Sequence, residues 1–72
     1  MQYKYESYLF DVCYYCNKLT GKNYTYKLNK NQAHIYYFSE GRKQEYHFDI
    51  QLFYGPLNYT AQEVAEMVVN NV

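Results

Sequence analysis

Two cysteines stand in the order Cys13-x-x-Cys16, a spacing that could serve metal binding or redox chemistry. A structural zinc site takes four ligands, so His34 and His47 would have to complete the set. The twelve residues between these histidines do not fit the three to five of a zinc-finger pair. We therefore predict no metal and no other cofactor, and we interpret both cysteines as packed or partly exposed thiols.

Glu45, His47 and Asp49 are spaced to share one face of a strand, where a histidine beside carboxylates could act in acid–base catalysis. With Arg42, Glu45 and His47 could form a small metal-independent ribonuclease. The same row is typical of the solvated side of a half-buried strand. Neither serine lies in a nucleophile motif, and the three glycines are isolated. We therefore predict that the protein is not an enzyme, and we keep the ribonuclease as a third alternative.

The composition is balanced in charge and rich in tyrosine. Seven Lys and Arg face seven Asp and Glu, which argues against a dedicated nucleic-acid binder because phosphate contacts need a basic surplus. Twelve tyrosines and four phenylalanines supply the kind of large, stiff contact area found in binding surfaces. We therefore predict a protein-binding module. The alternative is single-stranded nucleic-acid binding, in which bases stack on Tyr24, Tyr26, Tyr36 and Tyr37 beside Lys22, Lys27 and Lys30.

Length and hydropathy indicate the class of protein. At 72 residues, the sequence predicts a single small domain over 1–72. No stretch approaches the roughly 20 apolar residues of a membrane span. The first residues lack the basic and apolar regions of a signal peptide. These features predict a cytoplasmic protein with reduced cysteines and no membrane partner.

Strand patterns occupy the middle of the chain. Residues 43–54 alternate between apolar and polar side chains, which predicts a strand. Residues 33–39 precede it, and Glu40-Gly41 between them predicts a tight hairpin turn. Residues 23–28 alternate in the same way and predict a further strand.

The segment 5–16 fits two patterns. Alternation of Tyr8, Phe10 and Val12 is typical of a strand, and the aromatic and β-branched content favours that interpretation. A helix with Gly21 as its cap is the alternative, because an apolar stripe also recurs at helical spacing. The helical stripe would consist of Tyr5, Tyr8, Leu9, Val12, Cys16 and Leu19.

The C-terminal residues predict a helix. Thr60-Ala61-Gln62-Glu63 has the form of a capping box, and Ala61, Val64, Ala65, Val68 and Val72 follow on one apolar face. Gly55-Pro56 would end the last strand before this helix. The fold class predicted from these elements is α+β: an antiparallel β-meander of three to four strands followed by one C-terminal helix packed on one sheet face.

One helix can cover only one face of such a sheet, so the other face needs an explanation. The covered set expected from alternation is Tyr8, Phe10, Val12, Tyr46, Phe48, Ile50 and Leu52. The opposite face keeps apolar residues, and exposed apolar patches usually mark interaction sites. We predict that Tyr15, Ile35, Tyr37 and Phe53 bind a partner there, with a homodimer as one outcome.

Scattered residues resemble the small uracil-DNA glycosylase inhibitors of phi29-like phages. They are Phe10-Asp11-Val12, the run from Gly21 to Tyr26, Tyr54-Gly55, Thr60-Ala61 and Glu63. Members of that family are acidic, whereas this chain is neutral, so the resemblance implies only the broader class of small phage proteins that block a host enzyme. We therefore predict a phage- or plasmid-type inhibitor of a host enzyme, acting through a tyrosine-rich surface.

Overall fold

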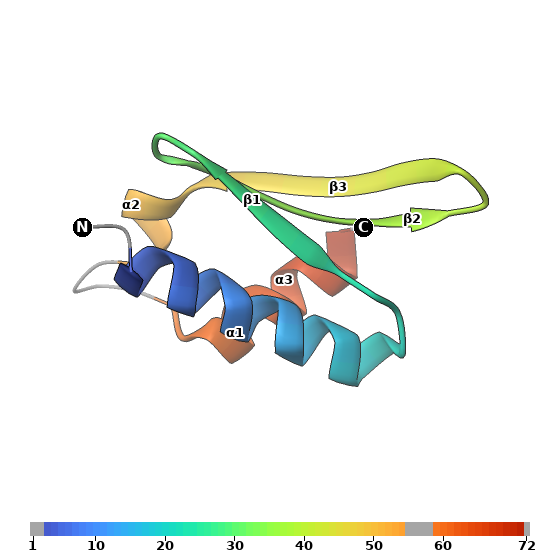
Figure 1. The fold of residues 1–72 in the computed structure, drawn as a ribbon. Coiled ribbons are helices and arrows are strands. Elements are labelled where there is room, and N and C mark those ends of the chain that lie inside the picture. Colours follow the sequence, from blue (N-terminus) through green and yellow to red (C-terminus); the bar gives the residue numbers. More distant parts are fainter. Residues whose placement is uncertain (1–2, 55–58, 72) are drawn as a thin grey trace.

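The chain forms two layers, a sheet and a pair of long helices that both lie on the same face of it (Figure 1). A computed structural model describes residues 3–54 and 59–71. The three strands are antiparallel in the order β1-β2-β3, which confirms an α+β fold with a three-stranded meander. The elements in chain order are α1 (Tyr3–Thr20), β1 (Thr25–Asn29), β2 (Gln32–Ser39), β3 (Arg42–Asp49), α2 (Ile50–Phe53) and α3 (Ala61–Asn71).

The two hairpins set the register of the sheet. Tyr26 faces Ile35 across β1 and β2, and Ile35 faces Tyr46 across β2 and β3. The predicted turn at Glu40-Gly41 is confirmed, with φ angles of 53° and 78°. Positive φ at both central residues is what a type I′ turn requires, and such turns match the twist of the flanking strands.

The strand prediction for residues 5–16 is wrong, because these residues belong to the helix α1. The segment forms a helix because helical spacing places Leu9, Val12 and Cys16 on one side, where all three are completely buried. Phe10, which the strand pattern placed in the core, is 63% exposed. Gly21 ends the helix at φ 74°, and its N–H bonds the Asn17 carbonyl oxygen at 2.7 Å, as in a left-handed C-cap.

The strand predicted over 43–54 is also too long. β3 ends at Asp49, whose carboxylate accepts the N–H of Gln51 at 2.9 Å and caps the short helix α2. The alternation continues through Ile50 and Leu52, but only Ile50 is buried and Leu52 is 75% exposed. The break predicted at Gly55-Pro56 lies outside the described residues.

The predicted capping box at the start of α3 is confirmed. The Glu63 N–H donates to Thr60 Oγ1 at 3.2 Å, and the Thr60 N–H donates to Glu63 Oε1 at 2.8 Å. Val64 and Val68 are fully buried, as expected from the apolar face, whereas Val72 is not among the described residues. The prediction of a single helix is wrong, because α1 and α2 accompany α3.

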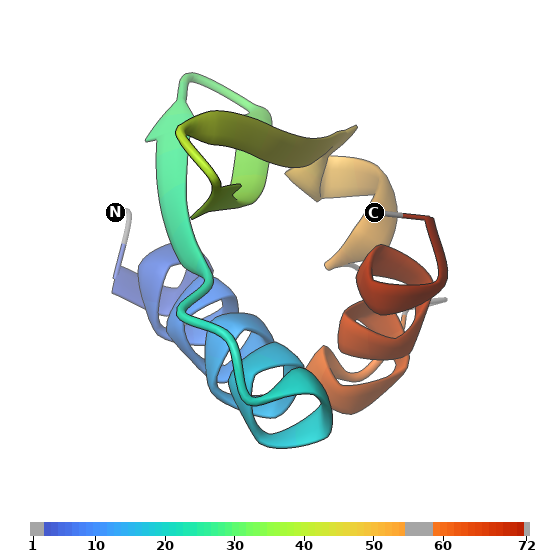
Figure 2. The same cartoon turned by 90° about the vertical axis from the view of Figure 1, so that its right-hand side faces the viewer.

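The core lies between the inner sheet face and the two long helices (Figure 2). α1 and α3 pack on one another, and the Cys16 thiol lies 3.7 Å from the Ala65 carbonyl oxygen. Ile35 and Phe48 project from the sheet into this core. Strand alternation then places the odd-numbered residues of β1 and β3 and the even-numbered residues of β2 on the uncovered outer face. None of the described helices is both long and apolar enough to span a membrane.

Candidate functional sites

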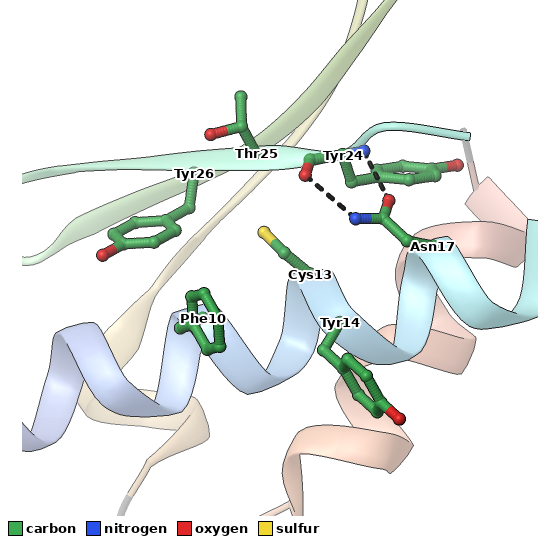
Figure 3. Close-up of a pocket in the computed structure, with 7 residues that line it drawn as sticks. All are labelled: Phe10, Cys13, Tyr14, Asn17, Tyr24, Thr25 and Tyr26. Atoms are coloured by element: carbon green, nitrogen blue, oxygen red, sulfur yellow. Dashed lines mark hydrogen bonds between the residues drawn. The ribbon is translucent and has the colours of Figure 1, made fainter. Parts of the chain in front are cut away.

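A groove runs between α1 and the edge strand β1 and encloses about 220 Å³ (Figure 3). We call it the α1–β1 groove. Figure 3 shows Phe10 and Cys13 on the side of the helix that faces the strand, with Tyr26 above Phe10, whereas the Tyr14 ring points away from the strand. Phe10 is 63% exposed and Tyr14 53% exposed, so two aromatic rings border the opening. The lining residues are Phe10, Cys13, Tyr14, Asn17, Tyr24, Thr25 and Tyr26.

Asn17 fixes one end of this groove. Its side-chain oxygen accepts the Tyr24 N–H, and its side-chain nitrogen donates to the Tyr24 carbonyl oxygen at 3.4 Å. The Asn17 amide therefore satisfies both the backbone N–H and the carbonyl oxygen of Tyr24, the residue just before β1, as a neighbouring strand would. The wall formed by Tyr24 is thereby held at a set distance from α1.

The ionisable groups at the groove floor are kept neutral. Burial and, to a smaller extent, the neighbouring Cys16 together raise the pKa of Cys13 to about 12. Burial also raises the pKa of Tyr24 to about 12, with smaller contributions from Tyr37 and Cys16. A thiol with such a pKa stays protonated at neutral pH and is a poor nucleophile. The groove therefore offers contact area and hydrogen bonds.

The outer sheet face is a second surface of different character. Lys43 Nζ lies 4.5 Å from the centre of the Tyr36 ring, and the rings of Tyr36 and Phe38 meet edge to face at 5.9 Å. His34 and His47 face each other across β2 and β3, with ring centres 5.7 Å apart. A shallow hollow on this face is lined by Lys27, Asn29, His34, Tyr36, Lys43 and Glu45.

The structure does not assemble the three residues suggested for a ribonuclease. Glu45 contacts His34 Nδ1 and lies 4.0 Å from Lys43 Nζ. Arg42 lies beside the Glu40-Gly41 turn, where it faces Ser39, whereas His47 faces His34 further along the sheet. Arg42 and His47 therefore lie at different positions along β3, with Glu45 between them.

The residues predicted to bind a partner do not form one patch. Ile35 is fully buried beneath the helices, so it presents no surface. Tyr37 packs on Tyr24 at 4.7 Å, whereas Phe53 packs on Phe48 at 4.5 Å. Tyr15 is half-buried on α1. The contacts of Tyr37 and Phe53 lie toward opposite ends of β2, because Tyr37 faces Gln44 whereas Phe48 faces Ala33.

The sequence interpretation missed Phe10, Tyr14 and Asn17 as surface-forming residues. Their signal is the helical spacing i, i+4 from Phe10 to Tyr14, which becomes visible only when the segment is treated as a helix. The same pair on a strand would point into the sheet's covered face. Missing α1 therefore hid the groove as well.

Among residues 3–54 and 59–71, no three His, Cys, Asp or Glu side chains are grouped to hold a metal ion. Searches with protein-family models, curated proteins and solved structures find no match to this chain. The resemblance to phage glycosylase inhibitors thus gains no support from them. The functional argument depends on the two surfaces described above.

Proposed function

We propose that this protein is a non-catalytic binding protein that takes up a side chain of a partner protein in the α1–β1 groove. The observation that carries the proposal is the pair of exposed rings, Phe10 and Tyr14, beside an apolar groove. Aromatic anchors next to desolvated pockets are where protein interfaces concentrate their binding energy. An inhibitor of a host enzyme is one form of such a protein, and it stays a prediction.

The size of the groove favours a protein side chain over a free small molecule. Its volume of about 220 Å³ lies below the range of about 300–1,000 Å³ that is usual for small-molecule sites. Phe10 and Tyr26 supply apolar walls, and the Asn17 bonds to Tyr24 hold the strand in place. A preformed site of this kind loses little conformational entropy on binding.

Photocrosslinking tests which surface meets the partner. A photoreactive phenylalanine analogue replaces Phe10 in one sample and Phe38 in a matched control, since both rings are more than half exposed but lie on different surfaces. We expect a crosslinked partner protein from position 10 and none from position 38. Phe10→Ala should then weaken binding of that partner about tenfold or more. Crosslinks from position 38 alone, or from neither position, would reject the groove.

Single-stranded nucleic-acid binding is the second candidate, and one observation favours it. Phe38 is exposed and Tyr36 half-buried on the uncovered face of the central strand, with Lys43 over the Tyr36 ring. Open sheets with aromatic side chains and adjacent cations stack bases in this way. Of the tyrosines proposed for stacking, the strand alternation places only Tyr36 on this face.

A further inference from the structure

The outer edge of β3 has free backbone hydrogen-bonding groups. Ile50 donates its N–H to the Asn31 carbonyl oxygen at 2.8 Å, which fixes the phase of the ladder between β2 and β3. Counting back from Ile50, every second residue of β3 directs its backbone N–H and carbonyl oxygen toward β2. The peptide groups of Lys43, Glu45 and His47 therefore point away from the sheet, and no described strand pairs with them.

The side chains along this edge alternate between basic and acidic types. On the outer face, Lys43, Glu45, His47 and Asp49 follow one another at every second position. An antiparallel copy of the same strand runs in the opposite direction, so basic side chains can face acidic ones throughout. The charge pattern of β3 is complementary to itself.

We propose that β3 pairs with β3 of a second copy of this chain, in antiparallel register about a two-fold axis at Tyr46. Lys43 then faces the partner's Asp49, and Glu45 faces the partner's His47. On the inner face, Tyr46 meets the partner's Tyr46. In this register the free peptide groups of the two β3 strands bond one another. The sheet grows to six strands, and the outer faces of the two copies lie on the same side of it. It differs from the patch of Tyr15, Tyr37 and Phe53 expected from the sequence.

The other edge of the sheet lacks these features. β1 has five residues, against eight in β3, and Asn17 already occupies the polar groups of Tyr24. The charged side chain of β1 is Lys27, and β1 has no acidic residue that Lys27 could face in an antiparallel copy of the same strand. We therefore assign self-association to β3 alone.

Complementary variants test the register. Position 43 faces position 49 of the partner at two symmetry-related places. In a homodimer of Lys43→Glu, two acids meet at each of these places, and in a homodimer of Asp49→Lys, two lysines meet there. Each variant alone should self-associate about tenfold more weakly than wild type. An equal mixture of the two should form a heterodimer with an affinity close to that of wild type, because position 43 of each chain again faces a side chain of opposite charge at position 49 of the other. Sedimentation velocity across a dilution series gives all three affinities.

Asp49 also caps α2, so a second pair guards against misfolding of Asp49→Lys. Glu45→Lys removes the acid that faces the partner's His47, and His47→Glu places two acids opposite each other. Their mixture sets the new lysine opposite the new glutamate, and neither variant changes the cap. Lys27→Glu on β1 is the matched control and should self-associate like wild type. A wild-type mass of 8.8 kDa at high concentration would overturn the proposal, as would mixtures that fail to restore association in either pair.

Discussion

Cys13 and Cys16 lie in the same buried stripe of α1, and their protonation is linked to folding. Burial raises the pKa of each thiol from 9.0 to about 12. Above pH 9.0 the unfolded chain therefore releases protons that the folded chain keeps. The unfolded state then binds fewer protons, and the free energy of unfolding falls as pH rises through this window.

We expect urea unfolding to show this loss of stability as pH rises from neutral through 9.0 and upward. Cys13→Ala should show a shallower decline than wild type, because one titrating group is removed from the unfolded state. Cys16 continues to lower the stability of this variant above pH 9.0, and Tyr8 and Tyr24, whose pKa values burial also raises to about 12, add to the decline above pH 10.0. Equal slopes for the variant and wild type would contradict this account.

At the scale of elements, the capping box decides where α3 begins. Thr60→Ala removes the oxygen that accepts the Glu63 N–H, and the expected cost is about 1 kcal/mol in the free energy of unfolding. Gln62→Ala is the control, since Gln62 is exposed in the same turn of α3. Denaturant midpoints followed by circular dichroism measure both variants. If both melt like wild type, the cap does not stabilise the helix.

Local chemistry predicted the two hairpins and α3 because their signals are short-range. Glu40-Gly41 specifies a turn, and Thr60 with Glu63 specifies a helix start. α1 could not be assigned from propensity, since its aromatic residues are typical of strands. Phe10 and Tyr14 are instead the exposed side of a helix whose opposite side packs on α3. That choice depends on a tertiary contact that the segment itself does not encode.

The end of β3 was missed for a related reason. Alternation continues past Asp49, so the period alone predicts a longer strand. The Asp49 cap on Gln51 turns the chain, and Phe53 then packs back on Phe48 at 4.5 Å. The α1–β1 groove could not be predicted either, because one of its walls is α1 and the sequence pattern favours a strand for that segment.

At the scale of the whole molecule, a neutral chain presents an aromatic sheet face to solvent. We expect single-stranded oligonucleotides to bind more weakly than about micromolar at physiological salt, because the chain has no excess of cations over acids to release counterions. Fluorescence anisotropy with wild type, Tyr36→Ala and the α1 control Tyr14→Ala checks this. Tighter binding that is steep in salt and lost only in Tyr36→Ala would establish the second candidate function.

The contact between Cys16 and Ala65 joins the first long helix to the last. During synthesis the sheet and α1 therefore emerge before the element that completes the core exists. Leu9 and Val12, fully buried in the finished protein, have only part of their cover until α3 has been translated. The nascent chain closes its core in a late step between segments distant in sequence, which is a slow class of contact. Ribosome pausing before α3 would prolong the exposure of the apolar stripe of α1.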